Sequence, residues 1–299
     1  ASKLDRLVLT FSKPVQQADA EMVANYTIDR DIKVNSASLG KNLKTVTLTT
    51  SLLADGVDYG ITVKNVRDRA RKANVIASDT RLVFRYSGLL ARWKLNEGQG
   101  KVAGDDLGNA LAGSLKGGAA WSNASGRVAL GFDGVDGVVA TPTSLADLAL
   151  PFSLSLWVNP AASQMEYAGI LGNHGEPFKG LCIQQDAKNA NSYVFNIGDG
   201  VQWQCTSPFQ LIADTWQHLA VVCDGENTVV YVNGVEKIKS AAKGPFAPNL
   251  DQEFKLGQGY HTGRYFRGLL SDVRMYRKAL SDKAVAQLIK ESEAKPSNK

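Results

Sequence analysis

Two acidic residues that lie two positions apart are the first candidates for catalysis in this sequence. Asp251 and Glu253 have this spacing, which on a β-strand would point both carboxylates to one face, as a nucleophile and a general acid require. They directly follow Pro248-Asn249-Leu250, however, and this composition is typical of a loop. The sequence therefore predicts no catalytic pair and a chain that is not an enzyme, while a longer parent protein could carry a catalytic domain.

The histidines and cysteines do not indicate a nucleophilic or metal-dependent site. His218 stands in a predicted strand with Leu219 and Val221, which indicates a structural histidine. His174 and His261 fall in predicted loops, and no serine or cysteine nucleophile is obviously paired with either. The cysteines, which lack the spacing of a metal site and permit at most one internal disulfide, are Cys182, Cys205 and Cys223.

Amide side chains dominate the polar positions of three predicted strands between residues 181 and 205. Apolar and polar residues alternate there, so the polar set shares one face if the apolar set faces the core. Amides hydrogen-bond sugars but are poor general acids, which favours binding over catalysis. The same alternation places Trp203 in the core and Cys182 and Cys205 on different faces. The amides predicted to line the opposite, candidate concave face are Gln184, Asn196, Gln202 and Gln204.

Rings and hydrogen-bonding groups gather in a predicted loop just before the last strand. Saccharide recognition combines planar stacking surfaces with donors and acceptors, so this loop predicts one rim of a carbohydrate-binding site, to which a second loop contributes. The predicted rim residues are Asn173, His174, Tyr260, His261, Arg264 and Tyr265. Tyrosine and arginine are also enriched in protein interfaces, so a protein contact is an alternative, as is a loop without a ligand. Trp121 is interpreted as a strand anchor rather than a stacking platform.

Oxygen ligands for a hard cation are concentrated in the segment Asp105-Asp106-Leu107-Gly108-Asn109. Carboxylates and an amide this close together suit Ca²⁺, whose remaining ligands are backbone carbonyls and water. The alternative is an ordinary Asp/Asn/Gly turn held by side-chain hydrogen bonds. A calcium ion at this place would be structural and would hold the sheets together.

Composition and charge narrow the class of protein. The 299 residues suffice for about two domains, and no apolar run approaches the roughly 20 residues of a membrane-spanning helix. The net charge of +5 arises in residues 1–87, with 14 basic and 9 acidic residues, because residues 88–299 hold 20 of each. The basic run from Arg67 to Lys72 could attract a polyanion, but we interpret it as a solvated loop. It has no interleaved aromatic residues, so we predict no nucleic-acid partner.

Short alternating segments over residues 1–87 predict a small antiparallel β-sandwich. Apolar residues alternate with threonines at 45–50, and short alternations recur at 7–11, 59–63 and 82–86 with turn signals between them. Three motifs of this region are Thr-Phe-Ser-Lys-Pro-Val, Asn-Tyr-Thr-Ile and Thr-Val-Thr-Leu-Thr-Thr. They resemble a bacterial Ig-like domain of the type found in S-layer proteins, and this resemblance implies a spacer.

The second part of the chain begins near Ser87-Gly88, after which the turns are glycine-rich and the strands longer. Residues 152–158 alternate cleanly and predict a strand. One helix is predicted near the end, where Ser281 is a suitable N-cap and Asp282 suits the positive helix N-terminus. Its apolar stripe is Ala284, Val285, Leu288 and Ile289. Residues 292–299 are predicted to form a polar tail.

Six segments in a fixed order resemble the LamG-like jelly roll, the concanavalin A-like sandwich of two stacked antiparallel sheets. They include Phe-Asp-Gly-Val-Asp, Trp-Gln-His-Leu and Tyr-Val-Asn-Gly, and together they extend over about 200 residues. The segments are residues 105–109, 132–136, 152–160, 216–225, 231–234 and 266–276, the last followed by Ala279-Leu280-Ser281. One such segment is weak evidence, but six in order predict the fold.

The resemblance implies an all-β chain, with an Ig-like β-sandwich at residues 1–87 and a LamG-like jelly roll at residues 88–291 that ends in a short helix. It also adds Asp272 to Asp105 and Asn109 as structural calcium ligands. Members of this family are mostly sugar-binding or adhesive modules joined to polysaccharide-degrading enzymes or surface proteins.

The predicted function is therefore a non-catalytic carbohydrate-binding module of a secreted or cell-surface bacterial protein, with a polysaccharide or other glycan as its partner. The alternatives are a module that binds other surface proteins and a glycoside hydrolase or polysaccharide lyase on the same fold. The chain begins without Met or an apolar leader, and we interpret it as a processed product or a piece of something longer.

Overall fold

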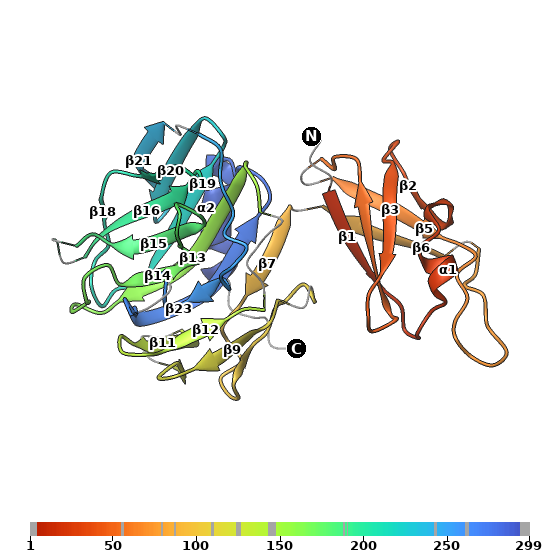
Figure 1. The fold of residues 1–299 in the computed structure, drawn as a ribbon, viewed down its shortest axis with the longest axis horizontal. Coiled ribbons are helices and arrows are strands. Elements are labelled where there is room, and N and C mark those ends of the chain that lie inside the picture. The colour runs from red at the N-terminus through yellow and green to blue at the C-terminus, as the bar shows by residue number, and fades with distance from the viewer. Residues whose placement is uncertain are drawn as a thin grey trace. The chain divides into compact units, whose positions relative to one another are not determined.

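The chain divides into two compact units, Ala1–Gly88 and Leu89–Lys299, next to the boundary expected at Ser87-Gly88. Figure 1 shows that both units are built almost entirely from β-strands. No helix in the described ranges is long and apolar enough to span a membrane. The computed structural model describes residues 5–54, 57–78, 80–86, 88–108, 111–123, 127–142, 148–187, 189, 191–241, 244–260 and 263–293.

The first unit contains two three-stranded antiparallel sheets, in the orders β1-β4-β3 and β2-β5-β6. Alternation explains its core, because Val46 and Leu48 of β4 are fully buried while Thr45, Thr47 and Thr49 between and beside them are half-buried. Membership of the Ig-like family stays a prediction for this unit. Its elements are β1 (Asp5–Thr10), α1 (Gln17–Ala20), the 3-10 helix η1 (Val23–Asn25), β2 (Tyr26–Ile28), β3 (Val34–Leu39), β4 (Thr45–Thr50), β5 (Asp58–Val63) and β6 (Thr80–Arg85).

The second unit consists of two larger antiparallel sheets and one helix. Its strands are β7 (Leu89–Trp93), β8 (Val102–Ala103), β9 (Gly113–Lys116), β10 (Ala120–Ser122), β11 (Ala129–Asp133), β12 (Val138–Ala140), β13 (Phe152–Pro160), β14 (Gly169–Gly172), β15 (Leu181–Gln185), β16 (Ser192–Gly198), β17 (Trp203–Cys205), β18 (Phe209–Gln210), β19 (Gln217–Cys223), β20 (Asn227–Val232), β21 (Val235–Ala241), β22 (Lys255–Leu256) and β23 (Arg267–Tyr276). The helix is α2 (Asp282–Glu293).

The two sheets of the second unit pack face to face around one hydrophobic core, as Figure 1 shows. The eight-stranded sheet has the order β10-β11-β23-β13-β19-β20-β21, with β7 also paired to β23. The nine-stranded sheet has the order β17-β16-β15-β14-β22-β12-β9-β8, with β18 also paired to β16. Leu154 and Leu156 of the first sheet and Ile183, Phe195 and Leu256 of the second lie in the shared core. The predicted all-β jelly-roll sandwich is confirmed.

The outer face of the eight-stranded sheet is partly covered by α2. Val285 and Leu288 of the helix are buried with Ala220, Val222 and Tyr231, whose side chains point outward from β19 and β20. The apolar stripe predicted from the sequence therefore faces the sheet. β13, at the centre of the sheet, is buried along its whole length.

The predicted start of the helix is also confirmed. The Ala284 N–H donates to the Ser281 hydroxyl at 3.3 Å, as an N-cap requires. The Tyr231 hydroxyl donates to the Asp282 carboxylate at 2.7 Å, and the Arg274 guanidinium pairs with Glu291 near the other end of the helix at 3.1 Å. These polar contacts fix the position of α2 on the sheet.

Candidate functional site

The strands predicted to carry amides form one end of the nine-stranded sheet, where β15, β16 and β17 are neighbours. Side chains paired across antiparallel strands share a face, and Ile183 of β15 pairs with Phe195 of β16 in the core. The next residues along these strands, Gln184 and Asn196, therefore point to the outer face of the sandwich. This placement agrees with the alternation in the sequence.

The prediction of which β17 side chains point outward is wrong. Gln204 pairs with the core residue Ile197, so its side chain faces inward at the sheet edge, where its Nε2 lies 3.2 Å from the Asp199 carboxylate. Trp203, one position earlier, is on the outer face. Gln202 is exposed in the turn before the strand. At the end of a sheet, loops rather than the core can cover a large ring, so apolar character does not identify the inner face there.

Cys182 and Cys205 point to the same outer face of the sheet. The prediction that they point to different faces is therefore wrong. Both pair with Asn196 on the strand between them. Two strand spacings of about 4.8 Å each separate the two backbones, which exceeds the roughly 7 Å that a disulfide bridges. Cys182, Cys205 and Cys223 are free thiols, and burial raises the pKa of Cys182, and that of Cys223 to about 12.

Two loops lie directly on this outer face, one between β14 and β15 and the other between β22 and β23. Glycines allow the close approach: a Cβ at Gly259 would collide with the Sγ of Cys182, and one at Gly198 would collide with the Phe178 carbonyl oxygen. The loops are joined where the His174 N–H donates to the Gly259 carbonyl at 2.9 Å. The sheet therefore supports both loops from below.

Five side chains from these loops, from β17 and from the segment before β14 form a continuous row, which we call the aromatic row. The Cζ of Arg264 lies 4.7 Å from the ring centre of Tyr167 and 4.6 Å from that of Tyr260. The ring centre of His174 lies 5.3 Å from that of Tyr260 and 3.5 Å from that of Trp203. His174 is buried, while the other four side chains keep part of their surface in solvent.

Two residues of the aromatic row have a left-handed backbone conformation, and a third has a shifted pKa. Tyr167 and Arg264 have φ values of 58° and 59°, a left-handed conformation that is rare for large side chains and is often found at functional sites. The Tyr260 hydroxyl donates to the Glu176 carboxylate at 3.4 Å, and burial together with the Glu176 charge raises the pKa of Tyr260. Tyr260 therefore stays protonated at neutral pH.

Three predicted binding residues lie beneath the loops instead of at the surface. The Asn173 Nδ2 donates to the Asn249 carbonyl at 3.3 Å, and its Oδ1 accepts from the Leu181 N–H at 3.3 Å. Gln184 and Asn196 are only 7% and 4% exposed. Gln184 and Asn196 lie on the outer face that the alternation assigns to them, but the loops cover that face. Asn173, predicted at the rim, is buried as well, so the burial of all three amides does not fit direct contact with a sugar.

The structure brings together three of the predicted rim residues: His174, Tyr260 and Arg264. Tyr265 is half-buried next to them, and its backbone forms bridges with Gly169 and Gln258. His261 lies outside the described residues. Sequence reasoning misses Tyr167, Glu176 and the outward position of Trp203, since only the fold places these residues beside the loop before β23.

A family model described as the Concanavalin A-like lectin/glucanases superfamily matches residues 133–286, which is more than half of the chain. The chain belongs to this superfamily. A search of the curated proteins found no match. The family assignment agrees with the two stacked sheets of the second unit.

Solved structures with this fold include binding domains. Domain 4 of AbnA, a GH43 extracellular arabinanase from Geobacillus stearothermophilus in complex with arabinotriose, has 22% identity and a TM-score of 0.54, with 67% of this chain and 97% of that domain covered. The binding domain of Botulinum Neurotoxin DC in complex with SialylT has 15% identity and a TM-score of 0.55, and the Botulinum Neurotoxin Type G receptor binding domain has 13% and 0.53. Each toxin match covers 69% of this chain and 52% of the toxin domain.

In this concanavalin A-like jelly roll, the predicted calcium ligand Asp272 forms ion pairs with two arginines. Its Oδ1 accepts from the Nε of Arg92 at 2.8 Å and from the Nε of Arg274 at 3.0 Å, and its Oδ2 accepts from Arg274 Nη2 at 2.6 Å. Burial alone would raise the pKa of Asp272, but these guanidiniums lower it. Two adjacent positive charges disfavour a Ca²⁺ ion at Asp272, and the role of this residue as a calcium ligand stays a prediction.

The other part of the predicted calcium site forms an ordinary turn as far as it is described. The Asp105 Oδ1 accepts from the N–H groups of Arg92 and Leu107 at 3.2 Å each. Asn109 lies outside the described residues. No group of three or more His, Cys, Asp or Glu side chains suited to a metal ion occurs within the described ranges. Calcium binding by Asp105 and Asn109 stays a prediction.

A serine–histidine pair lies inside the jelly roll but does not form a catalytic site. The Oγ of Ser155 and the Nε2 of His218 are 2.9 Å apart, and the two residues are 2% and 1% exposed, so a substrate does not reach them. The Nδ1 of His218 has no hydrogen-bond partner among the described residues, whereas a triad needs an acid there. Burial lowers the pKa of His218 to about 4. The structural role predicted for His218 fits this geometry.

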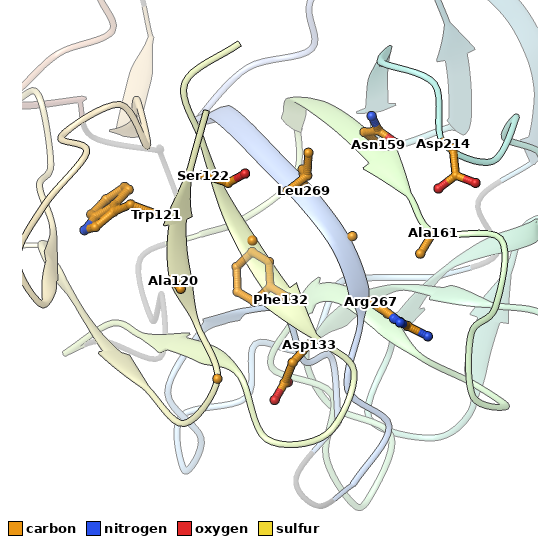
Figure 2. Close-up of a pocket in the computed structure, with 13 residues that line it drawn as sticks. Ala120, Trp121, Ser122, Phe132, Asp133, Asn159, Ala161, Asp214, Arg267 and Leu269 are labelled. Atoms are coloured by element: carbon orange, nitrogen blue, oxygen red, sulfur yellow. The ribbon is translucent and has the colours of Figure 1, made fainter. Parts of the chain in front are cut away.

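The outer face of the eight-stranded sheet carries a groove of about 420 Å³, which Figure 2 shows. It lies over β10, β11, β23 and the end of β13, and Asp133 and Asp214 appear on either side of Arg267 in this view. The Trp121 ring points away from the groove, packs against the core and donates its Nε1–H to the Gly100 carbonyl at 2.9 Å. Trp121 is thus placed as the strand anchor predicted from the sequence.

Asp133, Asp251 and Glu253 do not have the geometry of a hydrolytic pair. A general acid needs a raised pKa. The Asp133 Oδ1 instead accepts three backbone N–H groups of the turn after β11, at 2.9, 3.2 and 3.0 Å, and these lower its pKa against the effect of burial. Asp251 and Glu253 lie in a loop and not on a strand, as the sequence indicates.

Proposed function

We propose that this chain is a non-catalytic carbohydrate-binding module of a secreted or cell-surface bacterial protein. The glycan binds along the aromatic row of the second unit, and the first unit is a spacer of the Ig-like type. The observation that carries the proposal is the row itself, in which the partly exposed rings of Tyr167 and Tyr260 flank the Arg264 guanidinium. The partly exposed ring of Trp203 continues the row beyond His174.

The chemistry of the aromatic row suits a sugar. A pyranose or furanose has a face of C–H groups, which packs on an aromatic ring, and a rim of hydroxyls that donate and accept hydrogen bonds. Arg264 supplies N–H donors to such hydroxyls, and the exposed carboxylate of Glu176 supplies acceptors. Because Arg264 is already held between two tyrosine rings, its ordering costs little additional conformational entropy when a ligand binds.

The solved structures with this fold support a binding role. One of them is a domain of an extracellular arabinanase in complex with arabinotriose, and another is a toxin binding domain in complex with SialylT. These proteins supply the class of ligand to test first, namely short neutral and sialylated oligosaccharides. The arabinanase is extracellular, which also supports the proposed location of this chain.

Binding without cleavage is supported by the acids of the jelly roll. Asp133 is fixed as a hydrogen-bond acceptor, and Asp251 and Glu253 are in a loop, which leaves no strand-borne pair among the described residues. The buried Ser155–His218 contact is inaccessible to substrate. If reducing ends were released from a polysaccharide and a single Asp or Glu substitution abolished the release, the non-catalytic proposal would be wrong.

A glycan array followed by calorimetric titration tests the proposal. Arabinotriose is included as a defined probe. Trp203→Ala is expected to weaken binding about tenfold or more, because truncating an aromatic side chain that contacts the ligand costs more than about 1.4 kcal/mol. Val201→Ala is the matched control, since Val201 is an apolar residue 77% exposed just before β17 and outside the row. An array without any signal, with or without Ca²⁺, contradicts the proposal.

Protein binding is the second candidate function. Tyrosine, tryptophan and arginine, the exposed residue types of the aromatic row, are also those that dominate protein-binding hot spots. Another chain with this fold is a toxin binding domain in complex with rat synaptotagmin II. A negative glycan array, combined with a protein partner that binds the intact chain but not Trp203→Ala, would favour this alternative.

A further inference from the structure

The groove on the eight-stranded sheet is separate from the aromatic row. The aromatic row lies on the outer face of the nine-stranded sheet, and the core fills the space between the two sheets. The groove is therefore on the opposite side of the sandwich. Its volume of about 420 Å³ falls in the range of roughly 300–1,000 Å³ that is usual for small-ligand sites.

Small residues form the floor of the groove. Gly131 of β11 lies between Ala120 of β10 and Leu269 of β23 in the sheet, and Gly268 follows on the same edge of the groove. Because these positions carry little or no side chain, a strip of sheet backbone is open from the outside. The Leu269 side chain adds an apolar surface between Gly131 and Asn159, as its pairing across the sheet and Figure 2 show.

The polar groups of the groove are held in place by the surrounding backbone. The Asp133 carboxylate is fixed by the turn after β11. The Arg267 backbone is held on both sides by the Gln164 amide, while its guanidinium is exposed and forms no ion pair with a described residue. The Asp214 backbone N–H donates to the Pro160 carbonyl at 2.8 Å, which fixes its loop at the rim.

Asn159 is the most buried polar side chain that lines the groove, and it is only 5% exposed. A ligand hydroxyl in the groove would both donate to and accept from this amide.

The combination of groups fits hydroxyls better than it fits charges. Arg267 only donates, Asp133 and Asp214 only accept, and Asn159 does both, which matches a polyol whose hydroxyls act in both ways. Two carboxylates and one guanidinium line the groove, so an anionic sugar would meet net repulsion. The open strip of sheet beneath them accommodates a flat ring.

We infer that this groove is a second glycan-binding site, selective for a neutral oligosaccharide, so that one jelly roll engages glycan on two opposite sides. This inference rests on the proposed carbohydrate-binding function but not on the aromatic row. Two sites on one module raise its avidity for a polysaccharide, because the second binding event is intramolecular.

Gly131→Val tests the inference with little risk to the fold. A Cβ at Gly131 meets the Ala120 carbonyl and the Leu269 side chain at 3.4 Å, which is ordinary van der Waals contact, and valine favours a strand. Its methyl groups would occupy the groove. Lys237→Val at an exposed position of β21 is the matched control. Melting temperature and amide spectra verify that both variants remain folded.

Two-dimensional NMR with arabinotriose, cellotriose and trigalacturonic acid distinguishes the two sites. We expect the neutral probes to shift the side-chain amide signals of Asn159 in the intact chain and in Trp203→Ala, and Gly131→Val to weaken this binding about tenfold or more. The anionic probe binds the groove less tightly than the neutral ones. Lys237→Val leaves both sites unchanged.

The outcomes separate the groove from the proposed function. NMR shifts confined to the aromatic row contradict the inference of a glycan site in the groove but leave the proposed function in place. Shifts confined to the groove confirm the inference and refute the placement of the glycan on the row. If Gly131→Val binds as the intact chain does, or if the anionic probe binds the groove best, the inference is wrong. The absence of shifts at both places for every probe overturns both proposals.

Discussion

His218 should make the jelly roll lose stability in mild acid, and the size of this loss follows from its burial. The pKa of His218 falls from 6.5 to about 4, chiefly because burial disfavours the charged ring, and the residue is 1% exposed. Between these pH values the unfolded chain binds a proton that the folded protein does not. Stability is therefore fully present above pH 6.5 and decreases as the pH falls toward 4. At about 1.4 kcal/mol per pKa unit, the loss amounts to about 3 kcal/mol.

The assay is the free energy of unfolding from denaturant titrations at several pH values between 4 and 7.5. His218→Gln removes the titrating ring, so the variant is expected to lose about 3 kcal/mol less than the intact chain over this range. Carboxylates titrate in both proteins and cancel in the difference. Trp157→Phe changes the ring whose edge contacts His218, 5.6 Å between centres, but keeps the histidine, so it should retain the full pH dependence. Parallel pH curves for the intact chain and His218→Gln would refute the reasoning.

Three further perturbations have directions that the structure determines. Asp272→Asn removes the carboxylate that the buried Arg274 and the half-buried Arg92 guanidiniums share, and is expected to lower the free energy of unfolding by about 3–5 kcal/mol, which thermal and denaturant unfolding will measure. A change below about 1 kcal/mol would contradict the ion-pair assignment. Gly259→Ala places a methyl group against Cys182 and should lower the free energy of unfolding by about 1–3 kcal/mol and weaken glycan binding. If neither the stability nor the binding changes, the loop can move away from the sheet. Addition of Ca²⁺ in place of a chelator should leave the melting temperature unchanged, because two guanidiniums already bind the Asp272 carboxylate. A rise in melting temperature that Asp105→Asn abolishes would support the predicted calcium site.

The elements that could be predicted are those whose signal is local. The strand at residues 152–160 has clear alternation, and the helix at the end has its cap at Ser281 and an apolar stripe on one side. The order of short family motifs predicted the jelly roll as a whole. In each case the information lies within a few adjacent positions, so one sequence suffices.

The binding surface was only partly predictable, because its neighbours come from distant segments. Tyr260 and Arg264 could be found through the composition of one loop, but Tyr167 joins them only through the fold. Trp203 was assigned to the core because alternation along a strand does not reveal which set faces inward at a sheet edge. The pairing of Arg92 with Asp272 connects positions 180 apart, and nothing local indicates it.

The position of α2 determines where this protein can be shortened. The helix is the lid of an apolar area on the eight-stranded sheet, made of side chains such as Val222, Val229 and Tyr276. A version that ends before Asp282 would expose this apolar area to solvent and favour self-association, even though it would still contain every strand of the sandwich. Such a version should aggregate during expression, and a fusion partner is better attached beyond residue 293 than in place of the helix.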